Sequence, residues 1–357
     1  MFVPVVDSLN KPLMPTTCSR AARWIKFKKA TGFWKRGIYC VRLNVEPSDR
    51  KFQEIAVGID PGSKREGFTV KSESHTFANI QTHAIGWVKR AMETRKMLRK
   101  TRRSRNTPYR KCRWNRAIGG LAPSTKSRWQ LKLRICKWLL KLFPITHFNC
   151  EDIKAMSKEG QRKWNVSFSP IQVGKQWFYS ELIKLGTLKE TPGFSTYTDR
   201  NALGLNKTRN KLSSGFDAHC VDSWVLANQI VGGHTKPDNT KVLEIIPLQF
   251  HNRQLHVQNF SKGGVRKSYG GSMSEGFKRG SLVKHIKHGL CLIGGASKGF
   301  ISLHNKNSNK RICQNAKKQD INFLSYNTWR VTIPPTDKSV GFLVTTNDNL
   351  CRFENRL

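Results

Sequence analysis

Residues 54–72 read EIAVGIDPGSKREGFTVKS and predict two strands joined by a turn. The apolar, β-prone run from Ile55 to Ile59 is interrupted by the turn sequence DPGS at 60–63, and the extended pattern resumes at 67–70. The hairpin therefore presents Asp60 at the end of a strand. A third extended segment, 76–85, would complete a meander.

Three further segments continue this pattern along the chain. Residues 126–143 (KSRWQLKLRICKWLLKLF) predict an amphipathic helix, ended by Pro144, that packs on a sheet. Residues 145–153 (ITHFNCEDI) then predict a strand that carries Glu151 near its end. A helix is expected within 170–214 (QWFYSELIKLG), followed by a polar passage, and residues 215–233 (GFDAHCVDSWVLANQIVGG) predict another helix. Together these elements indicate an α/β fold.

The helix over 215–233 has expected ends and a functional face. Ser213 or Ser214 is a possible N-cap, and the Gly pair at 232–233 is the expected stop. His219 and Asp222 are three residues apart, so they share a face of this helix. Asp217 lies off that face.

Three acids stand within or at the end of apolar elements in this acid-poor chain: Asp60, Glu151 and Asp222. Convergent carboxylates are costly unless cations neutralise them, and hard oxygen ligands suit Mg²⁺ or Mn²⁺. Two such ions about 3.5–4 Å apart can clamp the attacking water and the leaving 3′ oxygen of a phosphodiester. We expect Asp60 to bridge both ions, Glu151 and Asp222 to bind one each, and His219 to lie near the scissile phosphate or its water.

The alternative interpretation is that each acid, taken alone, is a structural turn cap. The three together, in the order strand, turn, strand, basic helix, strand, helix, favour a two-metal site for hydrolysis of DNA. Asp152 and Asp217 are neighbouring acids that we expect to lie outside it. On a strand, Asp152 points to the face opposite Glu151.

The charge of the chain indicates a polyanionic partner. Its 357 residues include 64 Lys and Arg against 23 Asp and Glu, a formal net charge of +41, which favours nucleic acid bound over a long track. Ten Trp and 19 Phe exclude a purely disordered basic tail. With no secretory signal pattern or bilayer-length apolar stretch, we expect a soluble, intracellular protein. The nine cysteines form no C-x-x-C pair, which argues for reduced thiols and against a zinc ribbon.

Residues 89–116 are the strongest candidate for RNA contact, because they hold thirteen Lys or Arg and one acid, Glu93. A charge run is usually a solvated face, but this one would repel itself strongly without a polyanion. The first half is compatible with a helix up to Pro108. The arginines that we expect to contact RNA are Arg95, Arg99, Arg102, Arg103, Arg105, Arg110 and Arg113.

From residue 234 onward, β-prone runs alternate with Gly- and Lys-rich loops, which predicts a separate small β-rich domain. Basic residues crowd these loops, where they suit contact with phosphate. The expected DNA-binding residues are Lys262, Arg266, Lys267, Lys278 and Arg279.

Several motifs give the whole chain a family resemblance. They are PLMP at 12–15, GIDPG at 58–62, Glu151, the pair His219-x-x-Asp222, and the Arg-rich stretch after the first of the three acids. In this order they resemble IsrB, the HNH-lacking short relatives of IscB, which are transposon-encoded nucleases guided by an OMEGA RNA and ancestral relatives of type II CRISPR effectors.

The resemblance implies an RNase H-like (RuvC) nuclease domain split by insertions. It implies an N-terminal PLMP domain (1–52), a first RuvC segment (53–88), an Arg-rich bridge helix (89–118), RuvC segments II and III (119–233), and a C-terminal domain that contacts the target-adjacent motif (234–357). A guide RNA would pair with the target strand of double-stranded DNA. We expect a monomeric ribonucleoprotein in the prokaryotic cytoplasm, associated with the nucleoid when bound to DNA.

One departure from IscB decides the expected product. Residues 152–218 contain no histidine, so an HNH nuclease is missing and one active centre remains. By family analogy the enzyme should nick the displaced, non-target strand with Mg²⁺ or Mn²⁺, two ions per site. TnpB-like relatives are disfavoured because their zinc C-x-x-C pairs are absent. The alternatives are an unguided, structure-selective resolvase-like nuclease and an RNA-binding protein with a decayed nuclease site.

Overall fold

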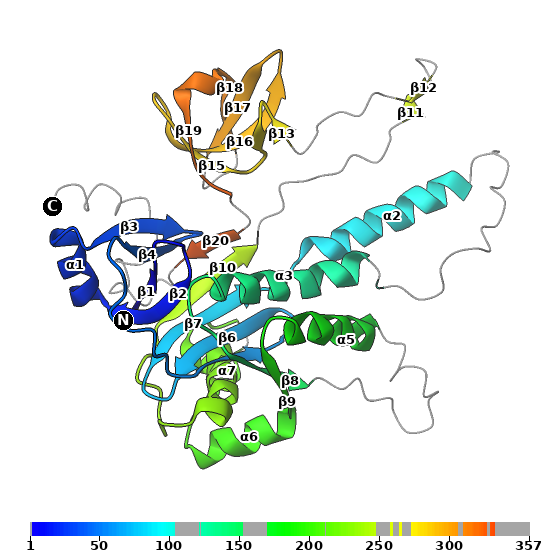
Figure 1. Ribbon diagram of the computed structural model, residues 1–357. Coiled ribbons are helices and arrows are strands. Elements are labelled where there is room, and N and C mark those ends of the chain that lie inside the picture. Colours follow the sequence, from blue (N-terminus) through cyan, green and yellow to red (C-terminus); the bar gives the residue numbers. More distant parts are fainter. Residues whose placement is uncertain are drawn as a thin grey trace. The chain divides into compact units, whose positions relative to one another are not determined.

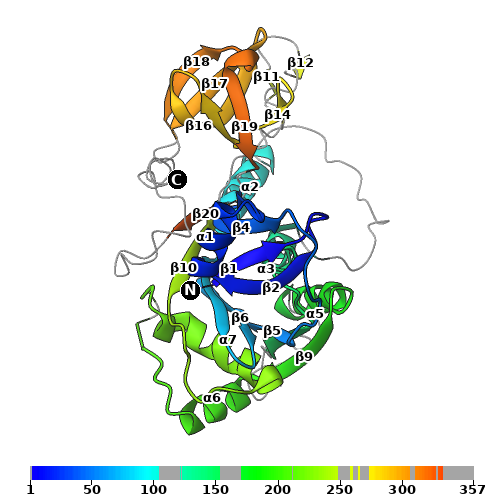
Figure 2. The same ribbon diagram turned by 60° about the vertical axis from the view of Figure 1, so that its left-hand side comes forward.

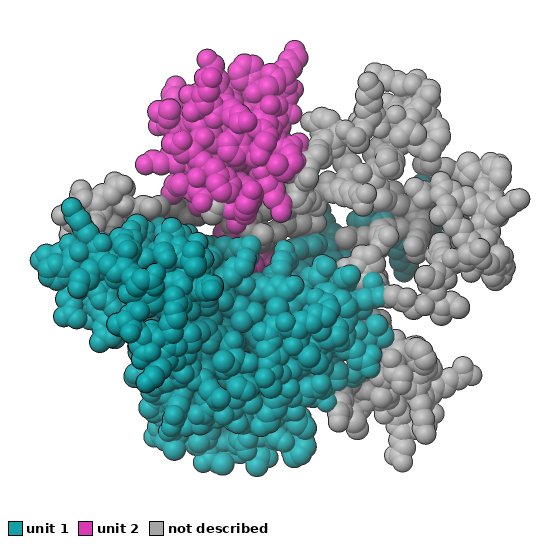
Figure 3. Space-filling model, in the orientation of Figure 1, with its two compact units in different colours: residues 1–245, 331–357 teal, residues 246–330 magenta. Residues whose placement is uncertain are grey.

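The computed structural model describes most of the chain in ten stretches. These are residues 2–103, 121, 123–152, 170–210, 212–247, 258–259, 264–265, 273–305, 310–326 and 329–332. The chain divides into two compact units, one of residues 1–245 with 331–357 and one of residues 246–330 (Figure 3). Among the described residues, none of the helices combines the length and apolar character that crossing a bilayer requires.

The first unit is built on a seven-stranded sheet in the order β20-β10-β7-β6-β5-β8-β9. Strands β5, β6 and β7 form the expected antiparallel meander, and β8 and β9 extend it by parallel pairing on the β5 side. On the other side β10 pairs in parallel with β7. The bounds are β5 (Ile55–Asp60), β6 (Arg65–Ser72), β7 (Thr76–His83), β8 (His147–Asp152), β9 (Thr187–Pro192), β10 (Val242–Pro247) and β20 (Trp329–Thr332).

The expected α/β fold class with an RNase H-like sheet is confirmed, since a three-stranded meander is continued by parallel strands beside its first strand. Helix α7 (Phe216–Val231) packs on one face of this sheet, and α3 (Pro123–Leu139) and α5 (Pro170–Ile183) lie on the other (Figure 1). Between β7 and α3 the chain forms the basic helix α2 (Trp87–Arg103).

Two glycines bring α7 unusually close to the sheet. A Cβ on Gly58 of β5 would lie 1.8 Å from the Ser223 carbonyl oxygen, and one on Gly67 of β6 would lie 2.2 Å from that of His219. No side chain fits in either place, so the α7 backbone rests directly on both strands. Residues 218–227 of the helix are buried as a result.

The expected ends of α7 are partly corrected. Its N-cap is Gly215, so the expectation of Ser213 or Ser214 is wrong. The Ser213 hydroxyl instead accepts a hydrogen bond from the Gly215 N–H at 3.2 Å and so shapes the turn before the helix. Gly232, with φ of 62°, ends the helix at the expected place because this left-handed conformation favours glycine.

The first residues form a separate four-stranded sheet in the order β2-β1-β4-β3, with α1 (Cys18–Lys26) after β2 (Figure 2). Pro12 and Pro15 lie in β2, an edge strand that pairs only with β1, where missing N–H donors are tolerated. Phe2 packs on Phe77 of β7, with ring centroids 5.1 Å apart, which ties this sheet to the larger one. The bounds are β1 (Phe2–Val6), β2 (Pro12–Thr17), β3 (Ala30–Lys35) and β4 (Ile38–Leu43).

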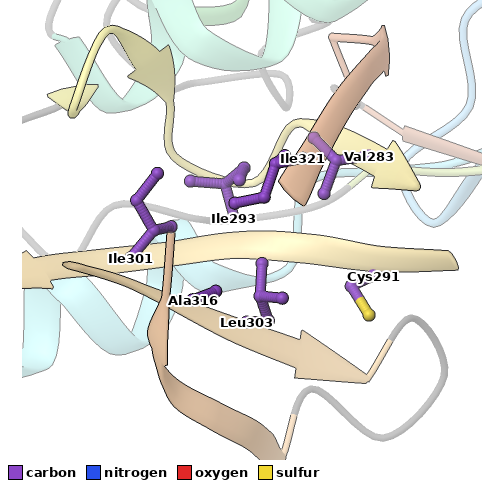
Figure 4. Close-up of a cluster of buried hydrophobic side chains, with 7 residues drawn as sticks. All are labelled: Val283, Cys291, Ile293, Ile301, Leu303, Ala316 and Ile321. Atoms are coloured by element: carbon purple, nitrogen blue, oxygen red, sulfur yellow. The ribbon is translucent and has the colours of Figure 1, made fainter. Parts of the chain in front are cut away.

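The second unit confirms that the C-terminal region is rich in β-structure. Its five-stranded sheet has the order β18-β17-β16-β15-β19, made by β15 (Leu282–His285), β16 (Gly289–Ser297), β17 (Phe300–Asn305), β18 (Arg311–Ala316) and β19 (Ile321–Ser325). Its core is one cluster of seven buried side chains (Figure 4), namely Val283, Cys291, Ile293, Ile301, Leu303, Ala316 and Ile321.

Candidate active site

Asp60 and Glu151 lie side by side at the carboxyl ends of two parallel strands. Ile59 of β5 is in register with Cys150 of β8, so the next residue on each strand is one of the two acids. Their side chains are hydrogen-bonded to each other. Asp60 is buried, with 7% of its surface exposed, and Glu151 is half-buried. The hairpin and the following strand thus bring together two acids that are 91 residues apart in sequence.

The contact changes the proton affinity of both carboxyls. Burial raises the pKa of Glu151 to about 8, and the charge and hydrogen bond of Asp60 add to the effect. Burial and the charge of Asp222 raise the pKa of Asp60, although the cationic side chain of Lys207 opposes them. Two carboxyls that touch in a buried place cannot both ionise cheaply, so the pair holds a shared proton unless cations are supplied.

Helix α7 brings Asp222 to the same place, where two cationic side chains hold it. The Arg200 guanidinium donates to Asp222 Oδ1 at 2.6 Å, and the Lys207 ammonium donates to Asp222 Oδ2. Asp222 is 3% exposed. Burial lowers the pKa of Lys207, but the carboxylates of Asp60 and Asp222 outweigh it and raise the pKa overall. Lys207 therefore lies within electrostatic reach of all three acids, since its charge also opposes the rise in the pKa of Glu151.

His219 lies one turn before Asp222 on α7 and is also buried. Its positive form lowers the pKa of Asp60, which places its ring within electrostatic reach of that carboxyl. All four predicted catalytic residues, Asp60, Glu151, His219 and Asp222, are thus brought together by β5, β8 and α7. Their catalytic and metal-binding roles stay predictions.

A buried polar network fixes β8 against α7 just before Glu151. The Asn149 amide donates to the Leu226 carbonyl at 2.8 Å and to Gln229 Oε1 at 2.9 Å, and it accepts from the Thr191 hydroxyl at 2.8 Å. Since these groups are buried, losing one partner would leave another unsatisfied. The network therefore holds the strand end that carries Glu151 in one position.

Helix α6 (Gly193–Ala202) approaches Glu151 from the other side. A Cβ on Gly193 would lie 2.9 Å from Glu151 Oε1, so the carboxyl sits over the first residue of this helix. The same helix supplies Arg200 to Asp222. Neither Arg200 nor Lys207 was expected from sequence, because both lie in the polar passage before α7, where no apolar period marks a buried position.

The two neighbouring acids lie outside this cluster, as expected. Asp152 pairs with Lys175 of α5 on the opposite face of the sheet. Asp217 is exposed in the first turn of α7. Side chains alternate between the two faces of the sheet along β8 and rotate around the axis of α7, so Asp152 and Asp217 point away from the acid cluster.

The donor set of the cluster fits hard divalent cations, although the arrangement is not yet that of a metal centre. Among the described residues, no three His, Cys, Asp or Glu side chains form a group that could hold a metal ion as they stand. Asp60 and Glu151 face each other, while Asp222 is engaged by Arg200 and Lys207. Carboxylate oxygens are nevertheless the ligands that Mg²⁺ and Mn²⁺ prefer, and the cluster supplies three carboxyls. Asp60, Glu151 and Asp222 are therefore the residues that would hold such ions.

The predicted RNA-binding residues lie on or after α2. Arg95, Arg99, Arg102 and Arg103 belong to this helix, while Arg105, Arg110 and Arg113 lie outside the described residues. Along α2 the described side chains after Val88 are exposed, among them Arg90, Lys96 and Lys100. A long basic helix with a solvated face is thus present, and its contact with RNA stays a prediction.

The predicted DNA-binding residues belong to the second unit. Lys278, at the end of β14 (Phe277–Lys278), is exposed, and its ammonium lies 6.0 Å from the Tyr326 ring centroid. The Arg279 guanidinium donates to the Ser274 hydroxyl at 3.3 Å. Lys262, Arg266 and Lys267 lie outside the described residues. DNA contact by this set stays a prediction.

Comparison with known proteins gives one family model and two structural likenesses. Residues 3–163, from β1 through β8, match a family model described as RRXRR protein. No curated protein matches by sequence. T. thermophilus RuvC in complex with a Holliday junction substrate is 11% identical, with a TM-score of 0.29 over 51% of this chain and 98% of that chain. The yeast mitochondrial Holliday junction resolvase is 14% identical, with a TM-score of 0.26 over 50% of this chain and 78% of its own.

Proposed function

We propose that this protein is a divalent-metal-dependent endonuclease that hydrolyses a phosphodiester bond of DNA at a single site. The observation that carries the proposal is the hydrogen-bonded contact between the Asp60 and Glu151 carboxyls, with Asp222 close enough to raise the pKa of both. Acids are rare in this chain, and bringing three of them together in a buried place is costly for folding. A cluster with this cost is typical of a functional site.

We assign a different role at this site to each group of residues. Asp60 and Glu151 would hold metal from the strand ends, and Asp222 would hold it from α7. When bound, the ions activate the attacking water and stabilise the leaving 3′ oxygen. Arg200 and Lys207 are placed to neutralise charge around Asp222, and a basic side chain there also suits the phosphate of the substrate. We assign to His219 the contact with the scissile phosphate or its water that the sequence predicts.

We further propose that a guide RNA directs this site, as the resemblance to IsrB implies, and that the product is a nick in the non-target strand. The net charge of +41 and the exposed basic side chains of α2 support RNA binding. Such contacts would read the A-form backbone and leave sequence recognition to base pairing. One acidic cluster serves one strand, which supports nicking over double-strand cleavage.

The test begins with purification of the protein after expression with its native flanking DNA. We expect one discrete RNA with a variable 5′ segment to stay bound through a high-salt wash. This complex should nick a supercoiled plasmid that carries the matching target, in Mg²⁺ or Mn²⁺ and not in EDTA. Asp60→Ala should abolish nicking and leave RNA and target binding unchanged.

Asp217→Asn is the matched control, because Asp217 is an exposed acid on the helix that carries Asp222. It should nick like the parent. Loss of nucleic-acid binding in Asp60→Ala would contradict the catalytic assignment. Cleavage of branched DNA without RNA, with only heterogeneous and salt-labile nucleic acid bound, would overturn the guided mechanism and support the unguided resolvase-like alternative.

A further inference from the structure

Helix α6 presents two large aromatic side chains to solvent on one side. Phe194 is 73% exposed and Tyr197 is 58% exposed. They are three residues apart on the helix, so they are neighbours on its surface. Large aromatic side chains are usually mostly buried, and two adjacent exposed ones mark a surface that takes a ligand.

This aromatic pair is continuous with the candidate active site. Phe194 directly follows Gly193, the residue over which the Glu151 carboxyl sits. Three residues beyond Tyr197, the Arg200 guanidinium lies 5.3 Å from the Tyr197 ring centroid and pairs with Asp222. Phe194, Tyr197 and Arg200 therefore form a row along one helix. The row begins next to Gly193, which lies beside Glu151, and ends at Arg200, which pairs with Asp222.

The chemistry of the row fits flat, electron-rich rings attached to a polyanion. Exposed aromatic rings are the groups on which unpaired nucleobases stack, and such stacking tolerates any base. A paired base offers no free face, so the occupant must be single-stranded. An apolar protein segment would leave the neighbouring acid cluster without a role in recognition.

Building on the proposed nuclease function, we propose that Phe194 and Tyr197 form a stacking platform for unpaired bases of the DNA strand that is cut. Stacking of the bases beside the scissile phosphate would hold that phosphate at Asp60, Glu151 and Asp222. The row is thus a binding subsite for single-stranded DNA, distinct from the predicted RNA contacts of α2. It also explains why exposed rings are kept next to an acid cluster.

The experiment uses the guide-RNA complex of an Asp60→Ala parent, which binds without cutting, and a target whose non-target strand carries 2-aminopurine beside the nick position. Stacking on the platform should quench 2-aminopurine fluorescence in the parent. The additional changes Phe194→Ala and Tyr197→Ala should remove this quenching. They should also weaken binding of a single-stranded DNA oligonucleotide at least ten-fold, since each stacked base contributes on the order of one ten-fold step.

Phe27→Ala is the matched control, because Phe27 is 62% exposed at the end of α1, away from the acid cluster. It should quench like the parent. Tyr197→Phe, which keeps the ring, should also retain the quenching. Because both platform residues are exposed, the Ala variants should keep the parent's unfolding midpoint, and this is measured alongside.

Unchanged quenching of 2-aminopurine fluorescence in the double Ala variant would overturn the assignment of Phe194 and Tyr197 as a stacking platform. Loss of the guide RNA from that variant, with DNA stacking retained, would also overturn it and assign the rings to RNA. These outcomes are distinguishable from failure of the proposed function, which is measured separately as nicking by the chain with Asp60 intact. A wild-type complex that nicks while the double variant stacks DNA normally would contradict only this inference.

Discussion

The carboxyls of Asp60 and Glu151 meet in a hydrogen bond across two adjacent parallel strands, at the point where both strands end. Burial, together with the charge and hydrogen bond of Asp60, raises the pKa of Glu151 to about 8, and burial together with the charge of Asp222 raises that of Asp60. The pair therefore opposes folding when both groups are ionised. A site built for cations has this property until cations arrive.

Asp60→Asn should stabilise the protein when divalent ions are absent. The pKa of Glu151 is about 8 in the folded state and 4.5 ordinarily, so between these values the folded state holds a proton that the unfolded state has lost. The free energy of unfolding therefore decreases as the pH rises through this range. In EDTA the wild-type free energy of unfolding should fall between pH 5 and pH 8, and the variant should lose less. The gain at pH 8 should be roughly 1–2 kcal/mol.

Urea unfolding at several pH values measures this effect, with Asp217→Asn as an exposed control that should follow the wild type. Equal pH slopes in wild type and Asp60→Asn would contradict the shared proton. The same variant should not nick DNA, so the prediction combines gained stability with lost activity.

Lys207→Met should increase the affinity of the free protein for Mn²⁺. Lys207 donates to Asp222 and is held by the charges of Asp60 and Asp222, so its ammonium competes with any cation for these oxygens. Removing one positive charge from the site should strengthen Mn²⁺ binding by about 3- to 10-fold, which corresponds to roughly 1 kcal/mol. Calorimetric titration with Mn²⁺ alone, without nucleic acid, measures it.

Lys184→Met is the control for this experiment, because Lys184 pairs with Glu181 on the solvated side of α5 and is 67% exposed. It should bind Mn²⁺ like the wild type. Weaker binding in Lys207→Met than in Lys184→Met would show that the lysine organises the site rather than competing for it.

The parts of the fold that were predictable are those in which burial shapes the sequence. The run from Ile55 to Ile59 is buried throughout, and α7 packs so closely that its buried face includes Trp224 and Leu226. Such segments carry an apolar pattern that can be recognised without neighbours. The acids were visible for the same reason, since Asp60 and Asp222 interrupt apolar elements.

Strand β9 and helix α6 were not predictable in this way. In β9 only Thr191 is buried, and in α6 only Thr196 is, so neither element shows an apolar period. Their places are set by pairing with β8 and by hydrogen bonds to α7. For that reason Arg200 and Lys207 were missed, although both contact a predicted site residue. Similarly, β10 joins the large sheet through parallel pairing with β7, a contact that its sequence alone does not reveal.

The buried ion pair between Glu66 and Lys132 should be strongly coupled. The Lys132 ammonium donates to Glu66 Oε1 at 2.6 Å, and the two side chains are 6% and 2% exposed. Lys132→Met leaves a carboxyl whose burial already raises its pKa, and it should cost about 3–5 kcal/mol of stability. The double variant Glu66→Gln with Lys132→Met should recover most of this loss.

A double-mutant cycle by urea unfolding at pH 7 measures the coupling. The exposed pair Glu181 and Lys184 serves as the comparison, and its coupling should be much smaller because solvent screens it. If the losses in free energy of unfolding caused by the two single changes add up in the double variant, Glu66 and Lys132 are not energetically coupled. Because Glu66 interacts electrostatically with Asp60, Mn²⁺ binding is measured alongside, and the double variant should alter it less than Lys207→Met does.

Lys71 should give the protein a rising stability in mildly alkaline solution. Its side chain is fully buried in β6, donates to the Ser72 carbonyl at 3.0 Å and to that of Gly232, and lies over the Trp224 ring. Burial lowers the pKa of Lys71 to about 8, although the charges of Asp238 and Glu73 oppose it. Between this value and the ordinary 10.5, the unfolded chain holds the extra proton.

The free energy of unfolding therefore rises with pH from about 8 toward 10 because of this residue. Lys71→Met keeps the length of the buried chain and removes the titration, so the variant should show a flatter profile over this range. Urea unfolding at pH 7.5, 8.5 and 9.5 in EDTA compares the two, and Lys184→Met should follow the wild type. If wild type and Lys71→Met keep a constant difference over this range, Lys71 titrates normally. Because Gly232 ends α7, the hydrogen bond from Lys71 to the Gly232 carbonyl also anchors the helix that carries His219 and Asp222.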